Sequence, residues 1–436
     1  MNAQELHKKL LASTIGGSTK DERLGLEAVE AFTLYVQNAF NDKVEVKNLE
    51  LLYSKVSLNS IIANATMQFD GFDTPVFLKI HIEANTKGQS ALGDDKEYGN
   101  AKLLEECGWP ILAPLTKNTN PEYPLLVYPR IDAPTLFNLI EESYGEKNNI
   151  TNDILDSFTA SQKVIGRATV LTLKECAVQT VINAPVQTLF LERFKIGGRL
   201  DQWYTDSTVF ALPGLSKPTA WSILKNAKWN INGELYSKTL AEIIESARKS
   251  LSFSGENSAL CATSHGDDHS GNVFIELSKN QAILFDPAFA GENPFTLCDT
   301  KALAHIGYMM MGGMYFDPKL KNPLYRFDEE TNTIFAFVDY RSTPLFNEHE
   351  EMARQIIDDR IIPMFRKARD MGGDIKKEII RQKDALSGCP LLTINIPKLL
   401  DSKDGRGMGL LPLVIMLNEL NGLPSLKYLS EKLNKI

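Results

Sequence analysis

Residues 265–287 read HGDDHSGNVFIELSKNQAILFDP, a polar loop followed by two short apolar runs with a polar turn between them. Two apolar runs that flank such a turn predict a β-hairpin. Asp267 and Asn272 precede the first run, and Asp286 follows the second. Carboxylates and amides at the edges of apolar strands are costly to bury without partners, so core packing alone does not explain them.

The turn of this hairpin decides how Asn272 and Asp286 meet. If residues 278–280 form a three-residue loop, Leu277 pairs with Gln281, and the ladder then places Asn272 directly opposite Asp286. Directly opposed residues lie about 5 Å apart. A four-residue loop would instead pair Asn272 with Pro287 and leave Asn272 and Asp286 as diagonal neighbours. In both registers an amide oxygen and a carboxylate are expected to converge.

An amide oxygen and a carboxylate form a ligand pair that suits Mg²⁺, because this ion prefers hard oxygen ligands and keeps sites for water and phosphate. Asp267 lies on the loop that enters the hairpin, where its carboxylate can accept a proton from a hydroxyl nucleophile. A metal site beside a general base is typical of phosphoryl transfer, in which the protein positions the nucleophile and neutralises charge.

The same segment resembles the catalytic loop of the aminoglycoside phosphotransferase-like family, whose members are relatives of the protein kinases and phosphorylate hydroxyls of small molecules. The family motif HGDxHxxN is matched by His265, Gly266, Asp267, His269 and Asn272. Asp286 and the proline after it match the metal-binding strand end of the family. The resemblance implies that Asp267 is the catalytic base, that Asn272 and Asp286 bind Mg²⁺, and that the cofactors are ATP and Mg²⁺.

The rest of the chain predicts an α+β protein. An amphipathic helix is expected first, at residues 22–40. Three strands, one helix and two strands follow, at residues 44–55, 60–69, 75–82, 94–107, 111–115 and 123–128. Helical patterns then dominate, at 135–144, 153–181, 237–250, 299–311, 349–371 and 375–384, around an irregular insertion at 197–228. The resemblance implies a bilobal protein-kinase-like fold. Residues 1–128, with an N-terminal helix, would form a small five-stranded nucleotide-binding N-lobe with one main helix. Residues 129–436 would form a larger, mostly helical catalytic and substrate-binding C-lobe with insertions.

A kinase-like first lobe needs a strand lysine for the nucleotide phosphates and a helix glutamate that holds it. Lys79 lies inside the otherwise apolar pattern VFLKIHI, residues 76–82, and Glu97 lies in the first turn of the predicted helix. Lys79 is also explained as an exposed residue of a strand face, and Glu97 as an acid favoured by the helix dipole. The downstream motif favours an ion pair between them.

Two further segments are expected to bind the nucleotide. The run YPLLVYPR, residues 123–130, resembles the strand that leads into the interlobe hinge of the family, so backbone groups of Val127, Tyr128 and Arg130 are expected to bind adenine. A core strand without a ligand has the same sequence. The phosphate-covering turn is expected near residues 54–60, where the family often carries glycines and this chain has none.

Close backbone approach to phosphate usually exploits glycine. Ser57 and Asn59 are therefore expected to contact the nucleotide through hydroxyl, amide or backbone groups. The missing glycines also leave open a non-catalytic, nucleotide-binding pseudokinase.

The resemblance implies a small hydroxylated acceptor of the aminoglycoside, amino-sugar or amino-alcohol type. Acids in the C-terminal part, among them Glu350 and Asp358, would attract a cationic acceptor, but a solvated acidic helix face explains them more simply. The leading hypothesis is an ATP-dependent small-molecule kinase that transfers the γ-phosphate. A protein-modifying kinase of the same fold and the pseudokinase are the alternatives.

The composition narrows the partners and the location. The net charge of the 436-residue chain is −8 and no basic block occurs, so nucleic acid is not an expected partner. The polar N-terminal segment and the lack of a long apolar run predict neither a signal peptide nor a membrane span. Five scattered cysteines without a CxxC pair predict a reducing, cytoplasmic location. The oligomeric state stays open.

Overall fold

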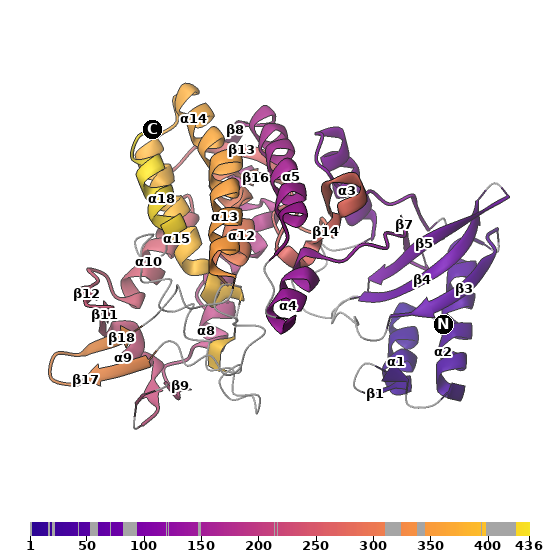
Figure 1. Ribbon diagram of the computed structural model, residues 1–436, viewed down its shortest axis with the longest axis horizontal. Coiled ribbons are helices and arrows are strands. Elements are labelled where there is room, and N and C mark those ends of the chain that lie inside the picture. The colour runs from indigo at the N-terminus through magenta and orange to yellow at the C-terminus, as the bar shows by residue number, and fades with distance from the viewer. Residues whose placement is uncertain are drawn as a thin grey trace. The chain divides into compact units, whose positions relative to one another are not determined.

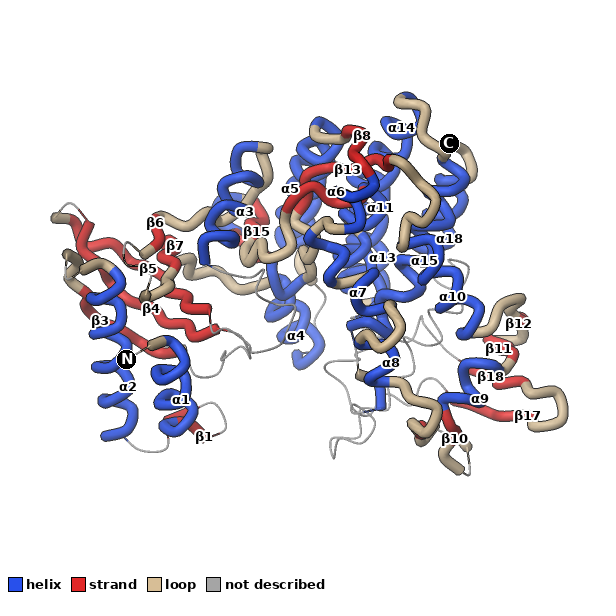
Figure 2. The backbone as a smooth tube through the Cα atoms, turned by 180° about the vertical axis from the view of Figure 1, so that it is seen from behind, coloured by secondary structure: helices blue, strands red, loops and turns tan. Residues whose placement is uncertain are grey.

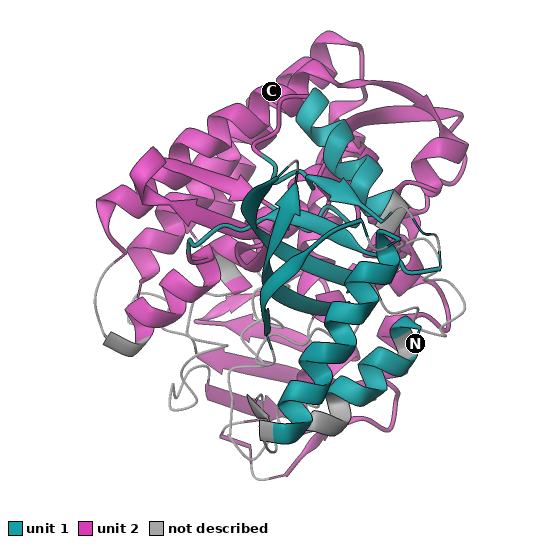
Figure 3. Cartoon of the chain, turned by 90° about the vertical axis from the view of Figure 1, so that its right-hand side faces the viewer, with its two compact units in different colours: residues 1–106, 111–133, 285–288 teal, residues 107–110, 134–284, 289–436 magenta. Residues whose placement is uncertain are grey.

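The chain divides into two compact units, which Figure 3 shows in teal and magenta. Unit 1 comprises Met1–Glu106, Ile111–Ala133 and Phe285–Ala288, and unit 2 comprises Cys107–Pro110, Pro134–Leu284 and Phe289–Ile436. The computed structural model describes all residues except 1, 16–17, 20–21, 42, 53–59, 70, 82–93, 119, 121, 147–149, 213, 216, 310–323, 338–344, 394 and 398–423. Both units are discontinuous in sequence, because the segment that contains Asp286 belongs to unit 1.

Unit 1 is built on a five-stranded antiparallel sheet with the strand order β3-β4-β5-β7-β6 (Figure 1). The strands are β3 Val46–Leu51, β4 Ser60–Phe69, β5 Phe72–His81, β6 Thr116–Lys117 and β7 Leu126–Pro129. Buried and partly exposed residues alternate along β4, because successive side chains of a strand point to opposite faces. The prediction of a strand at 111–115 is wrong, since β6 begins only at Thr116.

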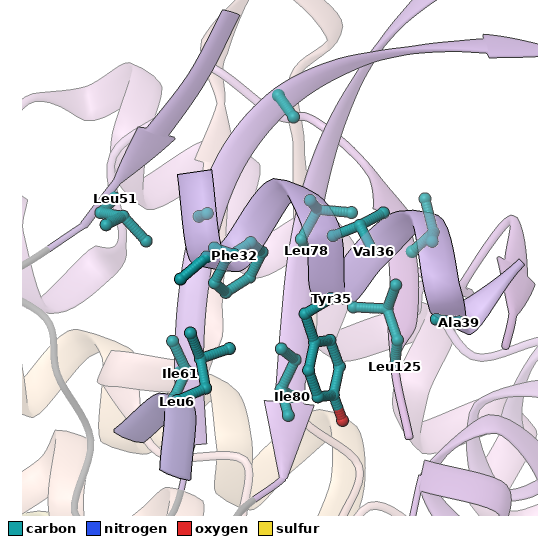
Figure 4. Close-up of a cluster of buried hydrophobic side chains, with 14 of the residues drawn as sticks. Leu6, Phe32, Tyr35, Val36, Ala39, Leu51, Ile61, Leu78, Ile80 and Leu125 are labelled. Atoms are coloured by element: carbon teal, nitrogen blue, oxygen red, sulfur yellow. The ribbon is translucent and has the colours of Figure 1, made fainter. Parts of the chain in front are cut away.

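Three helices accompany this sheet. The helices are α1 Ala3–Ser13, α2 Glu22–Ala39 and α3 Asp94–Glu106, and a short strand pair joins β1 Thr14–Ile15 to β2 Ser18–Thr19. Phe32 and Val36 of α2 meet Leu78 of β5 in a buried apolar cluster (Figure 4). α2 and α3 correspond to the two helices expected in this part of the chain. α1 is additional, because it forms where no helix was predicted.

Unit 2 is mainly helical (Figure 2). Its longer helices are α4 Leu136–Glu146, α5 Asn152–Leu171, α10 Leu240–Leu251, α13 Phe346–Ile356, α14 Ile362–Asp370, α15 Ile375–Thr393 and α18 Pro424–Leu433. Its shorter ones are α6 Val178–Ile182, α7 Leu191–Phe194, α8 Arg199–Trp203, α9 Trp221–Asn226, α11 Phe295–Cys298 and α12 Thr300–Ala302. α5 contacts α13 and α14, and α10 contacts α15. Within the described residues, no helix has the length and apolar character needed to cross a bilayer.

Unit 2 also contains a sheet that the sequence patterns did not predict. β8 (Lys174–Ala177), β13 (Ser258–Ser264) and β16 (Gly291–Pro294) pair antiparallel in the order β16-β13-β8. β8 lies inside the range 153–181, and the expectation of one helix there is wrong because α5 ends before β8. The paired strands are far apart in sequence, so no local pattern indicates their pairing.

The expected irregular insertion at 197–228 contains regular structure as well. It holds α8, α9 and the pair β9 (Val209–Phe210) and β10 (Thr219–Ala220). The chain then enters a four-stranded sheet of order β12-β11-β18-β17. Its strands are β11 Lys228–Ile231, β12 Glu234–Leu235, β17 Leu324–Asp328 and β18 Thr333–Phe337. The insertion is therefore a folded part of unit 2.

The hairpin that follows the polar loop forms, but in a different register from those considered. β14 (Val273–Glu276) pairs with β15 (Gln281–Leu284) so that Glu276, not Leu277, lies opposite Gln281. A short 3₁₀ turn and Asn280, whose φ is 48°, make a four-residue connection. The expected pairing of Leu277 with Gln281 is therefore wrong, and the direct opposition of Asn272 and Asp286 inferred from it is lost.

Candidate functional site

Lys79 is held between two carboxylates within unit 1. Its ammonium donates to Glu97 Oε1 and Oε2 at 3.0 and 2.8 Å and to Asp286 Oδ1 at 2.7 Å. Leu78 and Ile80 point into the apolar cluster, so Lys79 between them faces the other side of the sheet. Three residues that the sequence singled out separately thus form one charged cluster, and the interpretation of Lys79 as an exposed surface residue is wrong.

Burial and charge act against each other at this lysine. Burial by itself would lower the pKa of Lys79, but the carboxylates of Asp286 and Glu97 raise it above its ordinary value. The lysine therefore stays cationic. Glu97 is buried, whereas the Asp286 side chain is 39% exposed, so only one of the two carboxylates faces solvent.

Tyr128 adds a contact that the sequence reasoning did not foresee. Its hydroxyl donates to Glu97 Oε1, so the side chain of β7 helps to orient the glutamate of α3. Only the backbone of Tyr128 was expected to matter. Asn100, also on α3, donates to the carbonyl of Pro287 at 2.9 Å and fastens the segment that carries Asp286. Asp286 itself has a φ of 59°, a left-handed conformation in which Asp and Asn are enriched.

The polar loop of unit 2 is fixed by its own backbone. The Asn272 amide donates to the carbonyl of Asp267 at 2.9 Å, and the Asp267 N–H donates to His265 Nδ1 at 3.4 Å. Gly266 has a φ of 79°, and a Cβ there would lie 2.7 Å from the carbonyl oxygen of Phe289. The position therefore requires glycine. These contacts set the direction in which the Asp267 side chain leaves the loop.

The Asp267 carboxylate lies in a positive environment. Lys301 of α12 approaches its Oδ1 at 3.5 Å. Burial would raise the pKa of Asp267, but Lys301, followed by His269, His265 and Arg193, lowers it below the ordinary value. A partly buried carboxylate that stays ionised, with an oxygen that accepts no hydrogen bond from the described residues, is suited to accept a proton.

Asp268, the neighbour of this carboxylate, is buried rather than a solvated loop acid. Arg360 donates to Asp268 Oδ2 at 2.5 Å and to Asp299 Oδ1 at 2.8 Å. All three side chains are at most 3% exposed. Arg360 lies in a π-helical turn, Ile357–Ile361, and such turns are frequent at functional positions. Asp299 thus contacts the catalytic-type loop through a buried arginine.

The predicted nucleotide contacts have different outcomes. Ser57 and Asn59 lie outside the described residues. Val127 is a central residue of the sheet, paired with Leu78, and its carbonyl accepts from Leu115 at 2.8 Å. The N–H of Arg130 donates to the carbonyl of Pro75 at 3.2 Å. These backbone groups are engaged in the sheet, so adenine contacts at 127–130 stay a prediction.

Asn272 and Asp286, considered one at a time, each offer a side-chain oxygen that suits Mg²⁺. Asn272 uses its amide nitrogen as a donor to Asp267, which leaves the amide oxygen as the ligand atom. Asp286 uses Oδ1 for Lys79 and remains partly exposed. Both ligands are oxygens, as Mg²⁺ prefers. In the described part of the chain, no group of three or more His, Cys, Asp or Glu side chains forms a metal cluster.

Three contacts of the candidate site were not predicted, those of Arg360, Lys301 and the side chain of Tyr128. Arg360 is 92 residues from Asp268 in sequence, so nothing local connects them. Lys301 had a usable signal, because it lies in the same short segment as Asp299, two residues further along the chain. Tyr128 was within the expected hinge, but only the contact with Glu97 reveals its role.

No protein-family model matches the chain, and none of the curated proteins matches it. Solved structures similar to it include an ethanolamine kinase of Plasmodium vivax, at 10% identity over 95% of both chains and a TM-score of 0.43. A macrolide 2'-phosphotransferase type I is similar at 13% identity, over 81% of this chain and 95% of that one, with a TM-score of 0.33. Because both TM-scores are below 0.5, we base the proposed function on the contacts of the chain itself.

Proposed function

We propose that this protein is an ATP-dependent phosphotransferase of the bilobal, protein-kinase-like type, which moves the γ-phosphate of ATP to a hydroxyl of a small molecule. The observation that carries the proposal is the buried Lys79 ammonium bonded to both Glu97 and Asp286. A lysine kept cationic in this way provides a fixed positive charge for nucleotide phosphates. Unit 1 would bind the nucleotide. Unit 2 would supply the catalytic base and bind the acceptor.

The proposed roles follow from the chemistry of each side chain. Asp267 accepts the proton of the acceptor hydroxyl, since Lys301 and its other cationic neighbours keep it ionised. Asn272 and Asp286 are the proposed Mg²⁺ ligands, and the ion would neutralise charge on the transferring phosphoryl group. Arg360 positions the loop of Asp267 through the neighbouring Asp268. We expect a cytoplasmic protein, in keeping with its five free cysteines.

The acceptor is proposed as a small hydroxylated molecule. Its expected amino-sugar or amino-alcohol character gains no support from the acids of the C-terminal part. Glu350 is buried and accepts from Ser425 at 2.9 Å. Asp358 accepts from Tyr428 at 2.6 Å and pairs with Lys432 at 3.2 Å. Both acids therefore serve contacts with α18.

The test measures Mg²⁺-dependent ATP binding and acceptor-stimulated ADP release in purified wild-type protein and two variants. Asp286→Asn should lose the Mg²⁺ dependence of ATP binding, because a ligand oxygen becomes a neutral amide. Asp267→Asn should bind Mg-ATP as the wild type does and lose turnover by about 10²–10⁴-fold, the usual contribution of a general base.

Asp73→Asn is the matched control, because this exposed aspartate of β5 pairs with a surface lysine, Lys47. It should change neither measurement. Wild-type protein that does not bind ATP with Mg²⁺ would refute the proposal. ATP binding without turnover against any hydroxylated metabolite would favour the pseudokinase, and turnover only on a protein substrate would favour the protein-modifying kinase.

A further inference from the structure

Two arginines of unit 2 converge on one backbone carbonyl. Arg193 Nη1 donates to the carbonyl oxygen of Leu392 at 3.0 Å, and Arg199 Nη1 donates to the same oxygen at 3.4 Å. Both side chains are half-buried, so they are shielded and still reachable from solvent. Burial and the charge of Arg199 lower the pKa of Arg193 to about 10, which leaves it cationic at neutral pH.

A glycine turn brings these arginines together. The Gly198 N–H donates to the carbonyl of Lys195 at 2.7 Å, and Gly197 has a φ of 75°. A Cβ at Gly198 would lie 2.7 to 2.8 Å from the carbonyl oxygens of Glu192, Lys195 and Arg193. The turn therefore folds the start of α8 back onto α7, so that residue 199 comes beside residue 193.

The pair of arginines has no ion-pair partner among the described residues, although Asp267 acts electrostatically on Arg193. Among the described residues, neither guanidinium forms an ion pair with a carboxylate, and each spends one of its five N–H donors on Leu392. Arg199 also stacks over the ring of Trp203, with its guanidinium carbon 4.9 Å from the ring centroid. The carbonyl of Leu392 at the end of α15 accepts one hydrogen bond from each arginine. It is neutral, so it does not explain why two cations with further N–H donors lie next to each other.

The arginines lie beside the proposed base. Thr393, next to Leu392, accepts from Lys301 Nζ at 3.1 Å, and Lys301 also pairs with Asp267 at 3.5 Å. Arg193 acts electrostatically on Asp267. Arg193, Arg199 and Lys301 thus all bond to the end of α15, and Lys301 and Arg193 also act on the negative charge of Asp267.

We propose that Arg193 and Arg199 bind a carboxylate or phosphate group of the acceptor, so that the substrate is an anionic hydroxylated small molecule. This inference rests on the proposed function for the reaction at Asp267, but the anion site itself does not depend on turnover. Paired guanidinium groups match the planar, bidentate geometry of such anions. The substrate class therefore differs from the amino-alcohol type expected from the sequence.

The first test compares ADP release with acceptors that share a hydroxyl and differ in charge: glycerol, glycerate, glycerol 3-phosphate and ethanolamine. The value of kcat/KM for one of the two anions should exceed that for glycerol by at least about tenfold, or ~1.4 kcal/mol. The carboxylate and phosphate arms identify which anion is bound. Preference for glycerol or ethanolamine would overturn the proposal.

Arg193→Gln and Arg199→Gln should each raise KM for the preferred anion by at least about tenfold, the loss of one charged contact. Arg193→Lys keeps the charge without the fork and should fall between. Lys195→Gln is the matched control, because Lys195 lies on the same turn and pairs with Glu192 at the surface. Thermal denaturation identifies variants that remain folded, and an unchanged KM in those variants would contradict the proposal.

A second measurement on the wild-type protein needs no acceptor. Phenylglyoxal modifies arginine side chains, and peptide mass spectrometry reports the rate at each position. Inorganic phosphate or acetate should slow modification of Arg193 and Arg199 several-fold, while the exposed Arg369 of α14 changes little. No selective protection would refute the anion site. Protection in a protein that does not bind Mg-ATP would retain the anion site and reject the phosphotransferase.

Discussion

Lys79 of unit 1 and Arg360 of unit 2 each lie between two carboxylates, and these two clusters differ in how they meet solvent. In unit 1, Lys79 lies between buried Glu97 and Asp286, whose side chain is 39% exposed. In unit 2, Arg360 lies between Asp268 and Asp299, which are 1% and 3% exposed. The first cluster leaves a carboxylate edge for a ligand, whereas the second is closed on every side.

This difference in exposure suggests a ligand-binding role for the cluster of Lys79 and a structural role for the cluster of Arg360. A lysine is a point charge that can hold phosphate, while the arginine fork joins two backbone segments through fixed, directional bonds. Arg360 donates from Nη2 to Asp268 and from Nε to Asp299. Its Nη1 donates to Gln162 at 3.1 Å. Burial raises the pKa of Asp299, and Arg360 opposes that rise. We therefore assign the closed cluster to positioning the loop of Asp267.

Removing the cation of the closed cluster should have the largest effect. Arg360→Met leaves two buried carboxylates without a partner, so the free energy of unfolding should fall by about 3–5 kcal/mol. Urea denaturation measures the change. Arg369→Met, at an exposed position of the neighbouring helix α14, should change it by less than about 0.5 kcal/mol.

A combined variant sharpens this prediction. Asp268→Asn, Arg360→Met and Asp299→Asn together remove all three charges, and replacement of a complete buried ion cluster is often nearly neutral. The triple variant should recover roughly half or more of the stability lost by Arg360→Met. A triple variant less stable than Arg360→Met would show that the carboxylates have a separate structural role.

The open cluster should respond mainly in activity. Lys79→Met should reduce Mg-ATP turnover by about 10²–10³-fold, the usual effect of losing one electrostatic contact to the reacting group. Its stability should fall less than that of Arg360→Met, because Asp286 reaches solvent. Lys47→Met, on strand β3 of the same sheet and paired with Asp73 at the surface, should leave turnover unchanged. Equal losses of stability at Lys79 and Arg360 would abolish the distinction between the clusters.

A smaller effect is expected at Tyr128. Tyr128→Phe removes the hydroxyl that donates to Glu97, and a hydrogen bond to a charged group contributes about 1.5–3 kcal/mol. The loss should lie near the lower end, because Lys79 still bonds to Glu97. Chemical denaturation measures the stability, and the affinity for Mg-ATP should weaken with it. An unchanged affinity would show that Lys79 alone fixes the glutamate.

The smallest effect is expected for Lys301→Met, on the pH dependence of kcat/KM. Asp267 is active as a carboxylate, so turnover is lost as the pH falls through its pKa. Lys301→Met removes the largest influence that lowers this pKa and leaves burial, which raises it. The acid limb of kcat/KM should therefore move to higher pH. An acid limb that stays in place would mean that Asp267 is not the group that titrates.

Local sequence patterns were sufficient where structure depends on near neighbours. The range 60–69 predicts β4 with the observed bounds, and the helix expected at 94–107 is α3, one residue shorter. β4 has a clear alternation of buried and partly exposed residues, and α3 has a clear stop at Gly108. The grouping of Lys79, Glu97 and Asp286 was also anticipated in part, because Lys79 and Glu97 match positions that a kinase-like lobe requires.

Sequence reasoning failed where distant segments meet. β8 pairs with β13, more than 80 residues later, and its four residues resemble a continuation of α5. The hairpin register depended on one turn, which ends at Asn280 in the left-handed conformation and contains four residues instead of three. Arg360 had no local signal at all, since its meaning comes only from carboxylates 61 and 92 residues away.

The segment Phe285–Ala288 has a consequence for how the protein is made and divided. Lys79 and Asp286 are 207 residues apart, so a growing chain completes the lysine and Glu97 long before their third partner leaves the ribosome. A fragment that ends at Ala133 would contain most of unit 1 but not Asp286. Attempts to express the first unit alone must therefore graft this short segment back, or they will produce a lysine with half of its counter-charge.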